Sequence, residues 1–218
     1  MVTVGGLFSG IGGIELGFEK AGFKILWSNE FDENCNKTFR HNLNHKLYSE
    51  SITDINFKNI KPVDVLVGGF PCQAFSQAGL KKGFKDTRGT MFFEIARILD
   101  HHKPKAFLLE NVKGLRGHDK GNTFKTIMSI LNELGYKTLA HKVLNAKEFG
   151  LPQNRERIFI VGFLDYFLFD FPEPPMTDTK VGDILDKRVK DKYTISDKMW
   201  NSAKKRKEFY KKKGYGFG

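Results

Sequence analysis

Short apolar runs alternate with helix-like patterns along most of the chain, and this alternation constrains the fold more than any other feature. The strand-like runs are Val2–Phe8, Lys24–Ser28, Val63–Val67, Ala106–Leu109, His141–Leu144 and Ile158–Gly162. The helical patterns between them run up to Gly22, onward from a cap at Asp32, and over Thr90–His101 and Asn122–Leu134. Such alternation predicts an α/β fold, with a mostly parallel sheet and helices on both faces.

Composition argues against a membrane protein and against a disulfide scaffold. The 218 residues can bury one substantial core, and their 40% apolar and 28% charged content is typical of a soluble globular protein. The sequence has no signal peptide and no apolar run long enough to span a bilayer. Its two cysteines, Cys35 and Cys72, make neither a disulfide framework nor a metal cluster. We therefore expect a cytoplasmic protein without a metal site, in which Cys35 serves packing.

Positive charge is concentrated toward the end of the sequence. The net charge of +11 divides into +3 over residues 1–179 and +8 over residues 180–218. The composition changes at a proline-rich stretch that contains Pro172, Pro174 and Pro175. We expect a folded domain over residues 1–175 and a basic segment over residues 176–218 that is too short and polar to fold alone. Either a polyanion partner such as nucleic acid or a solvated tail would explain the charge.

Residues 69–76 place a thiol just after a buried strand. They read Gly-Phe-Pro-Cys-Gln-Ala-Phe-Ser and follow the run Val63–Val67. Open α/β sheets bind ligands at the carboxyl ends of their strands, and Pro71 stiffens the backbone before Cys72. The thiol is therefore a candidate nucleophile, although a free cysteine is also commonly a small buried hydrophobe.

A glycine-rich turn and an acidic residue predict a cofactor site. Phe8–Gly13 follows the first strand and opens a helix, and its closely spaced glycines let a ligand approach the backbone. Glu30 ends the second strand, where a carboxylate can accept hydrogen bonds from ribose hydroxyls. Together they predict a nucleoside-containing cofactor, while a tight turn and a helix-start charge are the alternatives.

Charged residues flank two further strands. Glu110 ends the run Ala106–Leu109 and is either a general acid or a structural carboxylate that caps the next turn. Arg155 and Arg157, spaced i and i+2 on extended backbone, share a face. They could bind a phosphate or a base oxygen, or pair with Glu156 or another neighbouring carboxylate.

A long polar loop directly follows the thiol segment. Residues 77–89 carry four basic side chains and three glycines that could act as hinges. Loops of this length inside a compact domain are usually functional or disordered. We expect this one to be a lid that closes over a polyanion.

These motifs together resemble the cytosine-C5 DNA methyltransferases of bacterial modification systems. The matching pieces follow the family's order over about residues 2–175 and are Phe8–Gly13, Ser28–Glu30, Gly69–Ser76, Glu110–Val112 and Gln153–Arg157. The resemblance implies that residues 1–175 form a Rossmann-like domain that uses S-adenosylmethionine to methylate cytosine in double-stranded DNA.

The resemblance also implies a role for each matched residue. Cys72 would add to C6 of a flipped-out cytosine, and Glu110 would act at N3. Arg157 would contact the base O2, with Arg155 in the adjoining backbone-binding site. The implied cofactor pocket comprises Phe8, Ser9, Gly10, Gly12, Gly13, Glu30, Phe31, Ser51, Ile52, Gly69 and Pro71. The implied DNA contacts are Gln73, Ser76, Lys81, Lys82 and Arg88.

Some features depart from the family pattern. Gly6 and Ser51 stand where the family often has acidic residues, and the family's last two motifs have no counterpart in the sequence. We therefore expect weak or no methylation by this chain alone, and a second subunit could supply target recognition and the last motifs. The alternatives are a tRNA-directed member of the same family and an inactive truncated remnant that binds nucleic acid.

Overall fold

The chain forms two compact units. A computed structural model describes residues 1–71 and 91–214 and divides the chain into Met1–Asp178 and Thr179–Gly218. Within the described residues, no helix has the length and apolar character needed to cross a bilayer. The assignment of catalysis to residues 1–175 remains a prediction.

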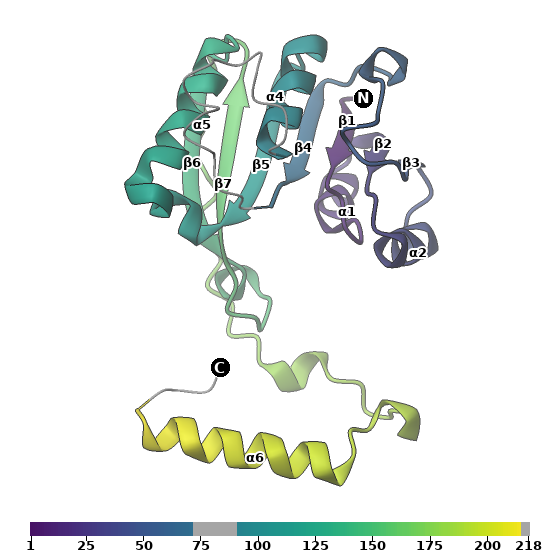
Figure 1. The fold of residues 1–218 in the computed structure, drawn as a ribbon, viewed down its shortest axis with the longest axis vertical. Helices are drawn as coiled ribbons and strands as arrows, with labels where there is room; N and C mark the ends of the chain where they lie inside the picture. The colour runs from purple at the N-terminus through teal and green to yellow at the C-terminus, as the bar shows by residue number, and fades with distance from the viewer. Residues whose placement is uncertain (72–90, 215–218) are drawn as a thin grey trace. The chain divides into compact units, whose positions relative to one another are not determined.

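A seven-stranded sheet forms the centre of the first unit (Figure 1). Its strands lie in the order β3-β2-β1-β4-β5-β7-β6. Their bounds are β1 Thr3–Leu7, β2 Lys24–Asn29, β3 Lys46–Tyr48, β4 Val65–Gly69, β5 Ala106–Val112, β6 Thr138–Asn145 and β7 Glu156–Phe163. Neighbouring strands from β3 to β5 are parallel, whereas β7 is antiparallel to both β5 and β6. The prediction of a mostly parallel sheet is confirmed.

Helices occupy the connections between the strands. The α-helices are α1 Gly13–Lys20, α2 Glu33–Asn42, α4 Met91–His102, α5 Asn122–Glu133 and α6 Asp197–Lys212. The short 3-10 helices are η1 Phe57–Asn59, η2 Lys113–Arg116, η3 His118–Gly121, η4 Ala146–Phe149, η5 Val181–Ile184 and η6 Asp191–Tyr193. Asp32 caps α2 as predicted, because its carboxylate accepts a hydrogen bond from the Cys35 amide at 2.8 Å. That hydrogen bond lowers the pKa of Asp32.

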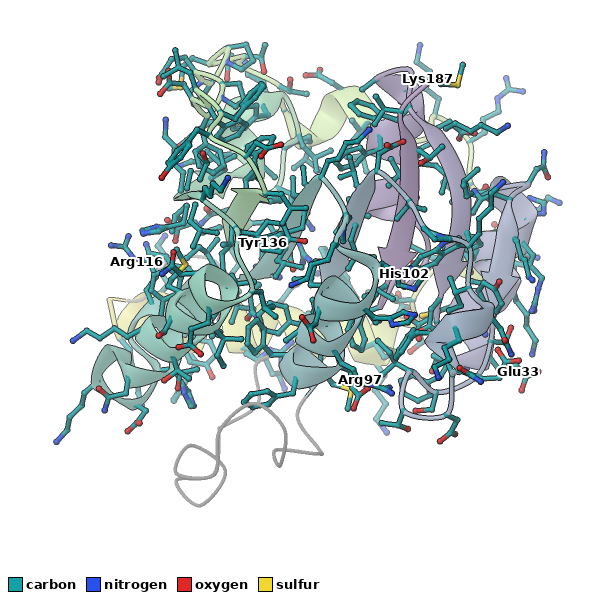
Figure 2. All side chains as sticks on the ribbon, turned by 90° about the horizontal axis from the view of Figure 1, so that it is seen from above. Glu33, Arg97, His102, Arg116, Tyr136 and Lys187 are labelled. Carbon is teal, nitrogen blue, oxygen red and sulfur yellow. The ribbon has the colours of Figure 1, made fainter. Side chains whose placement is uncertain are left out.

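Helices cover both faces of the sheet, as the two views together show (Figures 1 and 2). On one face, Val4 of β1 lies in a small cluster with Phe18 of α1. On the other face, a larger core joins Leu66 of β4 to Leu99 of α4 and Leu131 of α5. Burial of apolar side chains on both faces of a parallel sheet accounts for the continuous apolar runs in the sequence.

Tyr136, labelled in Figure 2, ties the start of β6 to the start of β5. Its ring lies 4.7 Å from the ring of Phe107, measured between centroids, in an edge-to-face arrangement. Its hydroxyl donates a hydrogen bond to the Pro104 carbonyl at 3.1 Å. Burial raises the pKa of this hydroxyl, so it stays a neutral donor inside the core.

Several strands differ from the sequence expectation, including β4, which covers Val65–Gly69 instead of Val63–Val67, and β7, which starts at Glu156 instead of Ile158. β3 was not expected, and it consists of only three residues that pair with the end of β2. β5 continues to Val112, and β6 starts at Thr138 instead of His141. Both extensions follow the antiparallel ladders of β7, because backbone pairing continues past the apolar residues that mark a strand in the sequence.

The second unit is polar and centred on α6. The Ser196 hydroxyl caps this helix by accepting a hydrogen bond from the Met199 amide at 3.4 Å, and no residue of α6 is buried. Lysine side chains stand over two of its exposed aromatic rings: Lys204 lies 5.2 Å from the Trp200 ring centroid and Lys213 lies 4.5 Å from that of Phe209.

Candidate active site at the carboxyl edge of the sheet

The predicted functional segments meet at one edge of the sheet. Phe8 follows β1, Glu30 follows β2, and Pro71 lies just beyond β4. Because these strands are parallel neighbours, their carboxyl ends reach the same edge. β7 runs in the opposite direction, so its amino end, which carries Arg157, opens at that edge as well.

The turn after β1 is built from residues in left-handed backbone conformations. φ is 53° at Phe8, 55° at Gly10 and 89° at Gly12. A side chain on Gly12 would collide with Leu43 and crowd Phe39, whereas one on Gly10 would meet nothing within 4 Å. Glycine at position 12 is therefore required by packing, and the open side at Gly10 lets a ligand approach the backbone.

Glu30 joins this turn to the end of β2. Its Oε2 accepts a hydrogen bond from the Gly10 amide at 2.8 Å, and its Oε1 accepts one from the Asp32 amide at 2.9 Å. Each carboxylate oxygen has a further lone pair that could accept a ligand hydroxyl. Beside it, Phe31 is 71% exposed and presents an unpacked aromatic ring.

A buried amide positions the third predicted cofactor segment. Asn29, only 2% exposed, donates hydrogen bonds through Nδ2 to the carbonyls of Tyr48 at 3.1 Å and Glu50 at 2.8 Å. These bonds fix the backbone that leads to Ser51, whose hydroxyl is hydrogen-bonded within its own turn. The side chain of Ile52 lies in the larger core, so this residue contributes packing beneath Ser51.

The thiol segment is described only up to Pro71. Outside the described residues lie Cys72 and the predicted DNA contacts Gln73, Ser76, Lys81, Lys82 and Arg88. The backbone that leads to Cys72 is held from β5: the buried Asn111 donates a hydrogen bond through Nδ2 to the Phe70 carbonyl at 2.9 Å. The thiol therefore follows a fixed stretch of chain beside the strand that carries Glu110.

Glu110 lies at the centre of a charged cluster. Its Oε1 is 3.0 Å from Arg157 Nε and 3.7 Å from Arg155 Nη2. The side chain of Glu110 is 18% exposed and that of Arg157 is 22% exposed, so solvent screens this pair less than a surface pair. Both arginines thus face one carboxylate, whereas Glu156 pairs with Lys113 at 2.8 Å.

Gly69 leaves room for this carboxylate. It pairs with Glu110 across β4 and β5, and a Cβ on Gly69 would lie 3.3 Å from Glu110 Oε2. That separation is tighter than ordinary carbon–oxygen contact, so any side chain on Gly69 would press on Glu110.

Asn145 holds the backbone of Arg155 and was not singled out in the sequence. Its Oδ1 accepts hydrogen bonds from the amides of Arg155 at 3.1 Å and Lys147 at 3.3 Å, and its Nδ2 donates to Asn154 Oδ1 at 2.7 Å. In the sequence an asparagine after an apolar run indicates only a turn. Its second role, across ten residues of chain, depends on the tertiary fold.

Comparison with known proteins identifies the family. The family model of C-5 cytosine-specific DNA methylase matches residues 2–218. The chain belongs to this family. Type II methyltransferase M.DsaV of Dactylococcopsis salina is 49% identical to this chain over 216 residues, which are 97% of this chain and 61% of the relative.

A second relative agrees with the first. Type II methyltransferase M1.ScrFI of Lactococcus lactis subsp. cremoris is 54% identical over 219 residues, 97% of this chain and 56% of the relative. The chain therefore spans about six tenths of the length of these relatives.

Among solved structures, the methyltransferase EhMeth of Entamoeba histolytica has the same fold. The two structures superpose with a TM-score of 0.71 at 22% sequence identity, over 91% of this chain and 64% of EhMeth. The Rossmann-like methyltransferase fold predicted for the chain is confirmed.

The residues at the carboxyl edge fit S-adenosylmethionine, on which C-5 cytosine-specific DNA methylases depend. The open turn at Gly10, the Glu30 carboxylate and the exposed Phe31 ring suit a nucleoside that stacks and donates ribose hydroxyls. Across residues 1–71 and 91–214, no group of three or more His, Cys, Asp or Glu side chains could hold a metal ion.

An apolar hollow of about 390 Å³ lies between α1 and the sheet. It is lined by Gly13, Ile14, Gly17, Phe18, Ala21, Phe23, Leu108 and Phe159. An apolar lining of this kind suits a further polypeptide segment better than the polar groups of a cofactor.

Proposed function

We propose that this chain forms the catalytic part of an enzyme that transfers a methyl group from S-adenosylmethionine to C5 of cytosine in double-stranded DNA. The observation that carries the proposal is the Glu110–Arg157 pair at the carboxyl edge, beside the strand that leads to Cys72. Membership of the C-5 cytosine-specific DNA methylase family and the type II methyltransferase relatives support it.

Cys72 opens the proposed reaction, because C5 of cytosine is not nucleophilic enough to take a methyl group directly. A bond forms between the Cys72 thiolate and C6, and ring electrons move toward C5. Glu110 assists by placing a proton or a hydrogen bond at N3. When bound, S-adenosylmethionine would supply the electrophilic methyl group that C5 takes up, and the broken S–CH3 bond would leave the neutral thioether S-adenosylhomocysteine. Loss of the C5 proton then breaks the bond to Cys72 and restores the aromatic ring.

The arginines orient the base and the acid. Arg157 Nε holds Glu110, and its Nη1 donates to the Glu156 carbonyl at 2.9 Å. The guanidinium has five donors, so others remain for the O2 of the cytosine. Arg155, 49% exposed, takes the neighbouring position toward the DNA backbone.

The cofactor binds, in this proposal, over the turn after β1. Phe8 packs against the adenine ring and Glu30 accepts the ribose hydroxyls. The remaining pocket residues are Ser9, Gly10, Gly12, Gly13, Phe31, Ser51, Ile52, Gly69 and Pro71.

DNA is held by residues that follow the thiol. The target cytosine is flipped out of the duplex, because C5 and C6 cannot be reached within the base stack. In this proposal, the basic side chains of residues 77–89, which follow the thiol segment, bind the phosphates of the duplex. The proposed contacts are Gln73, Ser76, Lys81, Lys82 and Arg88.

A segment outside residues 1–218 completes the enzyme in this proposal. The chain spans about six tenths of its relatives, and the hollow beside α1 offers an apolar docking surface. The completing segment belongs to the same polypeptide or to a second one and supplies target recognition. We expect weak or no methylation by residues 1–218 alone.

Methyl transfer from labelled S-adenosylmethionine to mixed-sequence duplex DNA tests the proposal. The chain is assayed alone and together with a polypeptide that carries the family's target-recognition region and last two motifs. We expect activity in the mixture, its loss in Cys72→Ser and its retention in Cys35→Ser. Methylation of tRNA but not of duplex DNA would instead establish an RNA-directed enzyme. Absence of both activities and of cofactor binding would establish a non-catalytic remnant.

A further inference from the structure

A buried carboxyl group beneath the cofactor turn has no part in the reaction proposed above. Glu15 lies in the first turn of α1 and is 1% exposed. Its Oε1 accepts a hydrogen bond from Ser28 Oγ at 3.3 Å, while its Oε2 has no hydrogen-bond partner within the described part of the chain. Burial raises the pKa of this carboxyl. Buried, incompletely paired carboxyl groups are costly, so this one calls for an explanation.

The Glu15 carboxyl occupies the space that a side chain on Gly6 would need. An ideal Cβ on Gly6 would collide with Glu15 Oε1 and would lie 2.9 Å from its Cδ and 3.0 Å from Ser9 Oγ. The φ of Gly6 is not positive, so no backbone strain demands glycine there. Glycine is therefore needed at this position because the Glu15 carboxyl, which projects from α1, occupies the space beside β1.

Ser9 links the carboxyl directly to the turn. The Ser9 amide donates to the Asn29 carbonyl at 3.0 Å, and the Ser9 carbonyl accepts from the Gly12 amide at 2.8 Å. The buried Ser9 hydroxyl lies close enough to lower the pKa of Glu15, although it forms no hydrogen bond of regular geometry with any described residue. Two buried polar groups thus face each other directly below the backbone that binds the cofactor.

A second path returns from the same carboxyl to the turn. Ser28 Oγ, bonded to Glu15, is also 2.9 Å from His45 Nε2. The His45 ring packs edge-to-face on Phe39, with the centroids 5.0 Å apart. Phe39 in turn packs under Gly12, where a Cβ would lie 3.1 Å from its ring. The carboxyl is therefore connected to both halves of the turn, through Ser9 and through Phe39.

We propose that Glu15 is the positioning residue of the cofactor turn: its carboxyl replaces a side chain on Gly6 and holds Ser9 and Gly12 in the geometry that binds S-adenosylmethionine. The inference rests on the proposed function in one respect, the identity of the cofactor. Glu15 need not touch the cofactor, because it acts through the backbone of the turn.

Cofactor affinity measured by calorimetry on the full 218-residue chain tests this role. Glu15→Ala removes the carboxyl that accepts from Ser28 Oγ and faces Ser9 Oγ, and we expect its dissociation constants for S-adenosylmethionine and S-adenosylhomocysteine to rise about tenfold or more. Glu15→Gln keeps the shape and one carbonyl oxygen, so we expect a smaller change. Lys20→Ala, on the exposed side of the same helix, is the control and should bind as the unaltered chain does.

Moving the carboxyl to the other element separates positioning from general stability. Gly6→Asp alone places two acidic side chains in one space, and we expect it to weaken binding. In the double variant Gly6→Asp with Glu15→Ala, the new carboxyl enters the vacated space from β1, and we expect affinity to return to within about threefold of the unaltered chain. Thermal unfolding of each variant shows whether it is folded.

Equal cofactor affinity in the unaltered chain and Glu15→Ala would overturn the positioning role while leaving the proposed function intact. A folded double variant without recovery would also overturn it, even if Glu15→Ala does not fold. Failure of the unaltered chain to bind either ligand would overturn the proposed cofactor, and the positioning role with it.

Discussion

The Glu110 carboxylate lies close to two guanidinium groups. The other side chains of its strand, β5, are mainly apolar. Arg157 is the closer partner, at 3.0 Å, and Arg155 lies at 3.7 Å from the same oxygen. Hydrogen bonds between charged groups are stronger than neutral ones and fix geometry as well as charge. In the proposed reaction this arrangement sets where the carboxyl meets N3 of the base.

Replacement of Arg157 should therefore affect turnover more than cofactor binding. Loss of a charge-assisted hydrogen bond costs about 1.5–3 kcal/mol, so we expect Arg157→Ala to lower kcat by about 10- to 100-fold. Arg157→Lys should recover only part of this loss, because an ammonium group lacks the planar fork. Arg155→Ala, at the longer distance, should cost less. Equal kcat values for the unaltered enzyme and Arg157→Ala, measured with saturating cofactor, would contradict this assignment.

A substitution at Gly69, on the neighbouring strand β4, tests the position of the same carboxylate. A methyl group on Gly69 would lie 3.3 Å from Glu110 Oε2, so Gly69→Ala should displace the carboxyl by a few tenths of an ångström. Small displacements of catalytic groups are costly, and we expect kcat to fall by about tenfold. Gly114→Ala is the control, because its Cβ meets nothing within 4 Å and its φ is not positive. A Gly69→Ala enzyme with unchanged kcat would show that Glu110 tolerates the added methyl group.

At the scale of elements, Asp64 ties three strands together at the end of the sheet opposite the site. Its Oδ2 accepts hydrogen bonds from the Thr3 amide at 3.0 Å and the Thr3 hydroxyl at 2.7 Å, at the start of β1. Its Oδ1 accepts one from Lys105 Nζ at 2.9 Å, just before β5. These partners, with Lys105 the strongest, hold the pKa of Asp64 well below its usual range.

This shift predicts how stability depends on pH. Because the folded state depresses the pKa of Asp64, its stabilising effect is complete above the unfolded value of about 3.9 and declines as pH falls below that value. Asp64→Asn should be less stable than the unaltered chain at pH 7, and the difference should shrink toward pH 3. Urea unfolding midpoints across this range measure it, with the exposed Asp170→Asn as control. A difference that stays constant with pH would exclude this role for the Asp64 charge.

Elements with local signals were predictable from the sequence, and elements set by long-range pairing were not. The Asp32 cap, the turn after β1 and the convergence of Arg155 and Arg157 all follow from spacing within a few residues. The three residues of β3 carry no strand signal, and they are held in place by pairing with β2.

Two further features could not be predicted from the sequence: the direction of β7, and the contact in which the Glu15 carboxyl fills the space beside Gly6. An apolar run has the same pattern whichever way its strand runs, so only the ladders with β5 and β6 fix β7 as antiparallel. In the sequence, Gly6 cannot be distinguished from any other strand residue, although its missing side chain makes room for Glu15, nine positions later. The burial of the Ile52 side chain in the core could not be foreseen either, because it depends on the packing of distant elements.

At the scale of the whole molecule, the two units carry different kinds of surface. Met1–Asp178 holds both apolar clusters and the charged cluster around Glu110. Thr179–Gly218 carries most of the excess positive charge and an α6 with no buried residue. A basic, exposed surface suits the proposed duplex substrate, whose phosphates attract it over long distances.

Trapping the proposed covalent bond between Cys72 and C6 of cytosine tests the reaction at its first step. The chain, completed by the polypeptide with the recognition region, is incubated with S-adenosylmethionine and a duplex carrying a mechanism-based cytosine analogue whose C5 substituent cannot leave. Mass mapping of the cross-linked peptide then identifies the residue. We predict an adduct at Cys72 in the unaltered chain and in Cys35→Ser, and none in Cys72→Ser. Methylation of unmodified DNA without any adduct at Cys72 would exclude this residue as the nucleophile.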